Sequence, residues 1–227
     1  MISVDNVYQR VLAIANKEQR GYITPQEFNL IAPLAQMEIF EQYFYDENQA
    51  DRNLKNSTQF SNSDEMIDEK ISIFKRVGPI PVSLGVGTLP TGLYRLGIVF
   101  RTNSEIEFEQ LTEEEMLYVR KSPLTKPTAK FPAYYRESAT TIKIYPNIAV
   151  VSCNYIQKPS RPNWNYVVVN EKALYNATGS VGFQIHDSDE SELVYKILSL
   201  AGITIAKPGL STIVEQQVVS QKQQEKQ

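Results

Sequence analysis

The only histidine of the chain, His186, stands directly before a run of acidic residues from Asp187 to Glu192. An imidazole beside carboxylates is the combination that general acid–base catalysis uses. A catalytic triad also needs a placed nucleophile and an orienting acid, which one sequence alone does not place. We therefore expect a structural or surface role for His186, and a small hydrolase or nuclease that uses it is a remote alternative.

The acidic run itself offers alternating carboxylates, as a calcium-binding loop does. An EF-hand loop needs glycine at position 6 and glutamate at position 12. Counting from Asp187 gives Glu192 and Leu198 at these positions, so the calcium interpretation fails. Acidic residues in the first turn of a helix are stabilised by the helix dipole, and the run predicts such a helix start.

Three other motifs resemble reactive or binding sites but have simpler explanations. Cys153, the only cysteine, lies in a predicted strand among small and β-branched residues, which indicates a core position and not a nucleophile. The glycines of residues 85–92 lack the Gly-Lys-Ser/Thr of a phosphate-binding loop and predict a turn. The glutamates of residues 113–115 follow a threonine and predict a capped, solvated helix. We expect no metal, no cofactor and no enzymatic activity.

Composition predicts a globular protein without a basic field. The chain has 227 residues, of which 42% are hydrophobic, and this is enough for one large or two small domains. The net charge of −3 and the pI of about 5.4 do not favour nucleic acid or an anionic membrane as the main ligand. With one cysteine, no signal-like start and no apolar run of membrane-spanning length, we expect a soluble protein that folds in a reducing cytoplasm.

Helical periodicity marks both ends of the chain. Apolar residues recur at three- and four-residue steps over residues 4–15, which predicts an amphipathic helix. Thr24 and Glu27 have the spacing of a capping box, with proline at the first helical position between them, and start a second helix that runs to about residue 48. A third helix is predicted over 64–75, and apolar residues at 193–201 have helical spacing behind the acidic run.

The middle of the chain is rich in β-branched residues, prolines and glycines. Residues 142–169 predict a β-hairpin followed by a corner braced by prolines. Further strands are predicted at 79–84, 93–100, 166–169 and 181–184, and a short helix after Thr112.

The order of helices, β-rich block and helices predicts the α+β class. We expect the N- and C-terminal helices to form one helical bundle with an inserted β-rich region and an extended C-terminal tail. The predicted parts are residues 1–77 and 187–207 for the bundle, 78–186 for the inserted region and 208–227 for a docking tail.

Tyrosine is enriched at protein interfaces, and the chain contains 13 tyrosines. An aromatic core explains them equally well, and this alternative stays open. The tail carries a thin apolar stripe that can order on a partner. The candidate residues for contact with another subunit or a portal protein are Tyr134, Tyr135, Trp164, Tyr166, Leu210, Ile213, Val214 and Val218.

Three segments together resemble virion structural proteins of tailed bacteriophages, especially the crAss-like group. They are residues 16–29 (Asn-Lys-Glu-Gln-Arg-Gly-Tyr-Ile-Thr-Pro-Gln-Glu-Phe-Asn), the Ile144-Tyr-Pro hairpin with Tyr155-Ile-Gln-Lys-Pro and Pro162-Asn-Trp, and residues 192–203 (Glu-Leu-Val-Tyr-Lys-Ile-Leu-Ser-Leu-Ala-Gly-Ile). The resemblance covers about Val4 to Ala206, and its motifs are structural and not chemical.

This resemblance implies a head-to-tail connector, or portal adaptor, that forms a ring, commonly a dodecamer. The implied partners are copies of the chain in a cyclic ring, the portal protein and downstream tail or ring proteins. DNA would pass through the lumen without sequence-specific binding, and no membrane is involved. The implied location is the virion, after synthesis in the cytoplasm of the bacterial host. The alternative within the same particle is another tail or capsid-vertex structural protein.

Overall fold

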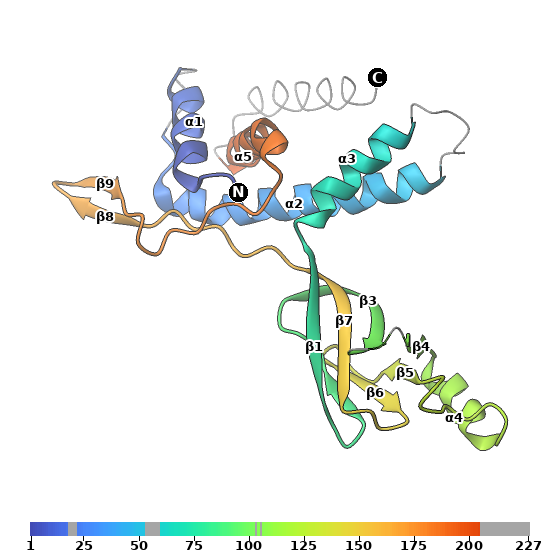
Figure 1. Cartoon of the computed structure of the whole chain (residues 1–227). Helices are drawn as coiled ribbons and strands as arrows, with labels where there is room; N and C mark the ends of the chain where they lie inside the picture. Colours follow the sequence, from blue (N-terminus) through green and yellow to red (C-terminus); the bar gives the residue numbers. More distant parts are fainter. Residues whose placement is uncertain (18–21, 53–59, 103, 105, 205–227) are drawn as a thin grey trace. The chain divides into compact units, whose positions relative to one another are not determined.

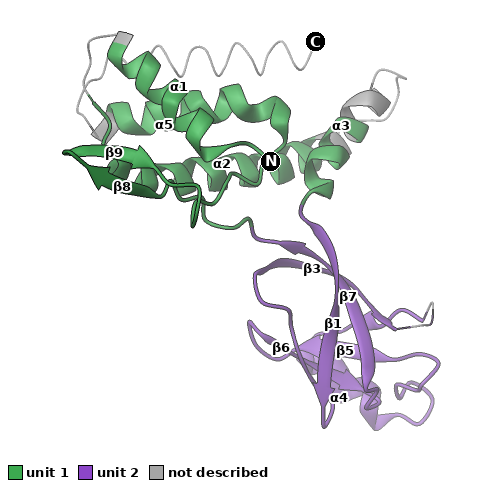
Figure 2. Ribbon diagram, turned by 60° about the vertical axis from the view of Figure 1, so that its left-hand side comes forward, with its two compact units in different colours: residues 1–73, 159–227 green, residues 74–158 purple. Residues whose placement is uncertain are grey.

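The computed structural model describes residues 1–17, 22–52, 60–102, 104 and 106–204. The chain forms two compact units, which are coloured separately in Figure 2. Unit 1 combines Met1–Ile73 with Pro159–Gln227, and unit 2 is Phe74–Lys158. Residues 159–186 therefore belong with the helices of unit 1, although the sequence placed them in the inserted region 78–186.

The described residues of unit 1 form four α-helices. They are α1 (Val4–Lys17), α2 (Pro25–Arg52), α3 (Phe60–Ser72) and α5 (Glu190–Thr204), the last preceded by a 3-10 turn, η1 (Asp187–Asp189). Helix α2 contacts α3 and α5, and α1 contacts α5. The core between them is apolar and aromatic, as the amphipathic periodicity predicts. Its buried residues include Val7, Tyr8, Val11, Phe28, Ile39, Phe40, Phe44, Leu193 and Ile197.

The predicted start of α2 is confirmed. The Thr24 backbone N–H donates to Glu27 Oε2 at 2.9 Å, and the Glu27 N–H donates to Thr24 Oγ1 at 3.3 Å. This reciprocal pair satisfies two of the backbone donors that a helix leaves unpaired at its N-terminus. The second capping box is confirmed too, because Thr112 and Glu115 make the same contacts at the start of α4 (Glu113–Lys121) in unit 2.

Unit 1 also carries a β-hairpin, β8 (Tyr166–Val169) with β9 (Lys172–Tyr175). Its two turn residues, Asn170 and Glu171, have φ angles of 50° and 62°. Positive φ at both central residues is typical of the tight turns whose twist matches that of the flanking strands. The strand predicted at 181–184 is only two isolated bridges, Val181 to Asn163 and Phe183 to Ile2.

Unit 2 is built on a seven-stranded mixed sheet with the order β3-β7-β1-β2-β6-β5-β4. All neighbours are antiparallel except the pair β4–β5. The side chains of Ile80, Val99 and Ile142 pack in its core with Cys153. The strands are β1 (Lys75–Ser83), β2 (Val86–Thr88), β3 (Leu93–Arg101), β4 (Glu109–Gln110), β5 (Ala133–Arg136), β6 (Thr141–Tyr145) and β7 (Val150–Gln157).

The hairpin predicted within residues 142–169 is wrong. Both strands exist, but β6 pairs with β2 and β5, whereas β7 pairs with β1 and β3. The hairpin of β1 and β2 separates them in the sheet, and its turn holds Leu84 and Gly85 at φ angles of 52° and 82°. A tight turn pairs its two strands locally, which leaves β6 and β7 on opposite sides of this pair.

The predicted fold class is wrong in its specific form, although the coarser α+β class fits. Among the described residues there are five α-helices, and α4 lies in unit 2 beside β5. In unit 1, α1, α2 and α5 run in different directions and do not form one bundle (Figure 1). The β-structure is not a single inserted block either, because the hairpin β8–β9 belongs to unit 1.

Candidate functional site

His186 acts as the N-cap of the 3-10 turn η1. The Ser188 backbone N–H donates to His186 Nδ1 at 3.3 Å, and the Ser188 hydroxyl lies 2.8 Å from the same nitrogen. The Asp189 N–H donates to the His186 carbonyl at 3.1 Å and closes the turn. These contacts engage one ring nitrogen in building the start of α5, which is the structural role that we expected.

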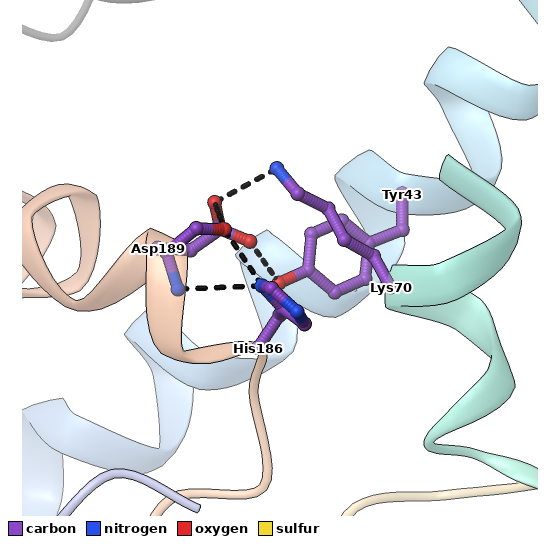
Figure 3. Close-up of polar contacts among 5 residues, drawn as sticks. Tyr43, Lys70, His186 and Asp189 are labelled. Carbon is purple, nitrogen blue, oxygen red and sulfur yellow. Dashed lines mark hydrogen bonds and ion pairs between the residues drawn. The ribbon is translucent and has the colours of Figure 1, made fainter. Parts of the chain in front are cut away.

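The carboxylate of Asp189 lies at the centre of a buried polar network, shown in Figure 3. Lys70 Nζ on α3 is 2.8 Å from Asp189 Oδ1, and the Ser188 hydroxyl donates to the same oxygen at 3.1 Å. The Tyr43 hydroxyl on α2 donates to Asp189 Oδ2. Burial, and then the negative charge of Asp189, raise the pKa of Tyr43 far above its ordinary value. The network thus connects α2, α3 and the start of α5, and it is arranged as a structural junction.

The remaining chemical candidates are also accounted for by the fold. Burial raises the pKa of the Cys153 thiol to about 11, and its residue is 0% exposed. Gly85 lies in the β1–β2 turn, as expected for a turn glycine. Within the described part of the chain, no group of three or more His, Cys, Asp or Glu residues is arranged to hold a metal ion. No helix among the same residues is both long and apolar enough to cross a bilayer.

Trp164, a candidate contact residue, packs inside unit 1 and is 2% exposed. Its indole N–H donates to Asp5 Oδ1 at 2.9 Å, and its ring centroid lies 4.4 Å from that of Tyr8. Asn29 on α2 binds the backbone of Trp164 twice: its side-chain amide donates to the Trp164 carbonyl at 3.0 Å and accepts from the Trp164 N–H at 2.8 Å. This is the packing alternative for Trp164, and the corner that follows β7 is fixed to α1 and α2.

Tyr134 and Tyr135 on β5 are also packed, with exposures of 2% and 8%. Tyr134 faces the main core of unit 2, and its hydroxyl donates to Gln110 Oε1 at 3.2 Å. Tyr135 faces the other way and packs with Met116 of α4. These two tyrosines therefore connect the sheet to its core and to α4. The tail candidates Leu210, Ile213, Val214 and Val218 lie outside the described residues.

The hairpin β8–β9 exposes an apolar face, which we call the hairpin surface. Val167 and Leu174 are directly opposite one another, and alternation along the strand puts Val169 on the same face. Their exposures are 50%, 52% and 47%. Tyr166, the remaining candidate, is half-buried, and its ring stacks on Trp164 with centroids 5.6 Å apart. The strand predicted at 166–169 is confirmed as β8, but strand propensity did not indicate that the three valines at 167–169 stay exposed.

Residues 117–131, in the second half of α4 and the loop after it, expose a second surface, the cationic apolar surface. The exposed glutamates 113–115 lie in the first turn of the same helix and are not part of this surface. Its apolar members are Leu117, Tyr118, Leu124 and Phe131, with exposures of 56%, 72%, 97% and 74%. The exposed cations Arg120, Lys121, Lys126 and Lys130 alternate with these apolar residues along the sequence. Two hydrogen bonds hold the loop against the end of α4: the Thr125 hydroxyl to the Val119 carbonyl at 3.0 Å, and the Lys126 N–H to the Ser122 carbonyl at 3.0 Å.

An open cleft of about 620 Å³ lies in unit 2 between β3 and residues 107–110. Its lining combines apolar side chains with Glu107 and Glu109, and contains no histidine, cysteine or lysine. The Phe108 N–H donates to the Val99 carbonyl at 2.8 Å across it. The lining offers neither a nucleophile with a base nor a cation for an anionic ligand.

Comparison with known proteins leaves the chain without an assigned family. A scan of the sequence against models of protein families found no match, and a search of curated proteins found no significant match either.

Proposed function

We propose that this chain is a structural subunit of a tailed-phage virion, a head-to-tail connector (portal adaptor) that joins a ring on the portal and extends the DNA channel to the tail. The observation that carries the proposal is the hairpin surface. The resemblance of residues 16–29 and 192–203 to phage virion proteins supplies the kind of particle.

The hairpin surface is costly for a chain that works alone. A two-stranded sheet is at best marginally stable by itself in water, and strands with open edges invite pairing with other chains. No third strand joins β8 and β9 within the described residues. The rings of Tyr166 and Tyr175 pack against Trp164 and hold the base of the hairpin, with centroids 5.6 and 5.9 Å from that of Trp164. A hairpin that is anchored at its base and exposes Val167, Val169 and Leu174 beyond it is suited to contact a neighbouring subunit.

A ring subunit also needs two different contact surfaces. In a cyclic ring each subunit presents one face to the neighbour on one side and another face to the neighbour on the other side. The hairpin surface belongs to unit 1 and the cationic apolar surface to unit 2, so each unit exposes an apolar surface of different chemistry. The net charge of −3 is consistent with DNA passing through a lumen without being held.

The test is assembly of the purified chain with the portal protein of the same phage. Negative-stain microscopy and mass photometry should show rings on the portal with the wild-type chain. The variant Val167→Asp with Leu174→Asp should fold, as judged by circular dichroism and Trp164 fluorescence, but should not join the ring. The matched variant Val167→Thr with Leu174→Thr keeps β-forming residues without charge and should still bind.

Failure of the wild-type chain to bind any virion component would overturn the proposal. A reconstruction of the virion that locates the subunit at the tail or a capsid vertex, away from the portal, would replace the connector with the alternative structural role.

A further inference from the structure

Helix α2 exposes a stripe of apolar and acidic side chains. Leu30, Leu34 and Tyr45 are 65%, 58% and 63% exposed, and Glu38 and Glu41 lie between them. The positions follow one another at steps of three or four residues, which places them on one face of the helix. We call this face the acidic apolar stripe. The sequence of α2 contains no lysine or arginine before its last residue, Arg52.

The opposite face of the same helix packs against the core of unit 1. Its residues Phe28, Ala35 and Phe44 are 0%, 0% and 2% exposed and pack in the core of unit 1. The core of unit 1 therefore does not use the leucines of the stripe. Single exposed leucines are ordinary, but apolar residues repeated along one helix face indicate a surface for a partner.

The cationic apolar surface of unit 2 has the complementary charge. From Met116 to Arg136 the sequence contains five cations and no acidic residue. Its side chains Leu124 and Phe131 are 97% and 74% exposed, so apolar and positive groups are presented together. Nucleic acid would match the cations, and its bases could stack on the exposed rings of Tyr118 and Phe131. It would not match the acidic stripe, so it would leave that surface uncovered.

We propose that the acidic apolar stripe of one copy docks against the cationic apolar surface of the next copy. Copies of the chain then cover both surfaces. Each copy carries one half of the contact on unit 1 and the other half on unit 2. Such a head-to-tail contact is heterologous and propagates from copy to copy. The inference rests on the proposed function only in taking a closed ring, and not an open filament, as the product.

The apolar groups and the charges have different roles in this contact. The leucines and aromatic rings lose water on docking and supply the favourable free energy. The glutamates and lysines surround them, speed association and exclude wrong orientations. Association should therefore weaken as salt is added, because exposed charges are screened.

The experiment reverses the charges on each side of the contact in the full chain. The first variant is Lys126→Glu with Lys130→Glu, and the second is Glu38→Lys with Glu41→Lys. Sedimentation velocity over a concentration series should show self-association of the wild-type chain. Each variant alone should associate at least about tenfold more weakly, as expected for like charges that face each other.

Restoration is the decisive result. In an equimolar mixture, every contact between one variant and the other again pairs glutamate with lysine. The two variants should therefore associate in alternation, as strongly as the wild type. A chain that carries all four changes should also self-associate. The control, Lys158→Glu with Arg161→Glu, makes the same change of net charge as Lys126→Glu with Lys130→Glu. Its positions are exposed and lie outside both surfaces, so it should leave association unchanged.

Glu38 pairs with Lys196 at 3.5 Å, so Glu38→Lys places two cations together and its fold needs a separate check. A second pair of variants avoids this problem. Leu30→Gln and Leu124→Gln change exposed side chains, and each should weaken association while leaving the circular dichroism spectrum unchanged.

Several outcomes would overturn this contact. They are a wild-type chain that stays monomeric up to its solubility limit, association that the charge reversals do not change, association lost only on truncation after Lys207, and a cationic surface that binds a single-stranded oligonucleotide in place of a second copy. Rings on the portal formed by the charge-reversed variants would remove this contact and leave the proposed function. Charge-dependent self-association without portal binding would remove the proposed function and leave the contact.

Discussion

Lys70 Nζ lies 2.8 Å from Asp189 Oδ1, although the two residues are 119 positions apart in the sequence. Their side chains are 16% and 2% exposed, so this ion pair is largely shielded from water. A buried carboxylate is tolerated only where charges and hydrogen bonds compensate its lost hydration. Lys70, Tyr43 and Ser188 provide this compensation from three separate elements.

Replacement of Lys70 by methionine should destabilise unit 1 by about 3 kcal/mol, because it leaves Asp189 buried without its cation. Adding Asp189→Asn should recover much of this loss, since asparagine carries no charge and still accepts from Tyr43. Urea unfolding followed by the fluorescence of Trp164, the only tryptophan, measures both changes.

The control for this pair is Arg10→Met. Arg10 lies 3.2 Å from Glu190, but the two side chains are 56% and 26% exposed. Exposed pairs contribute little, so the expected loss is less than about 1 kcal/mol. Equal losses for Lys70→Met and Arg10→Met would show that burial does not set the strength of the Asp189 pair.

Replacement of Asn29 by alanine should loosen the corner that holds Trp164. The change removes both hydrogen bonds to the Trp164 backbone and leaves a buried donor and acceptor without partners, at a cost of about 1–3 kcal/mol. The emission of Trp164 should shift to longer wavelength as water reaches the indole. Asn48→Ala, which removes a local bond to the Phe44 carbonyl at 2.6 Å, should leave the emission unchanged.

The Cys153 thiol should be protected from thiol reagents in the folded chain. Burial raises its pKa from 9.0 to about 11. Two pKa units lower the thiolate fraction about a hundredfold at pH values below both, and the thiolate is the reactive form. Ellman's reagent should react slowly with the native chain and rapidly in guanidinium chloride. Val150→Cys, at a position 54% exposed on the same strand, should react rapidly in the native state; equal native rates would contradict the prediction.

The capping box of α2 should make unit 1 sensitive to acid. Hydrogen bonds from Thr24 lower the pKa of Glu27 below its ordinary 4.5. Because the folded pKa is the lower one, the contribution to stability is present above pH 4.5 and is lost as the pH falls through the folded value. Thr24→Ala should cost about 1 kcal/mol at neutral pH.

Urea unfolding at a series of pH values tests this sign. The difference in stability between the wild type and Glu27→Gln should shrink as the solution is acidified. Glu41→Gln, on the exposed side of the same helix, controls for the change of net charge. A difference that grows on acidification would contradict the prediction.

The sequence by itself determined the features that depend on neighbours within about one helical turn. The capping boxes at Thr24 and Thr112, the periodicity of α1 and the acidic start of α5 all belong here. Each depends on contacts between residues a few positions apart, and these contacts form in the same way whatever the rest of the chain does.

Only the tertiary structure decided which distant residues meet. Strand propensity identified β6 and β7, but a strand pattern does not name its partner, and the tight β1–β2 turn placed another pair between them. Trp164 can be buried because Asn29 and Asp5 accept hydrogen bonds from its N–H groups. Asp189 can be buried because Lys70 and Tyr43 donate hydrogen bonds to its carboxylate. Burial of a polar group depends on partners more than a hundred residues away, so it is a property of the folded chain and not of the local sequence.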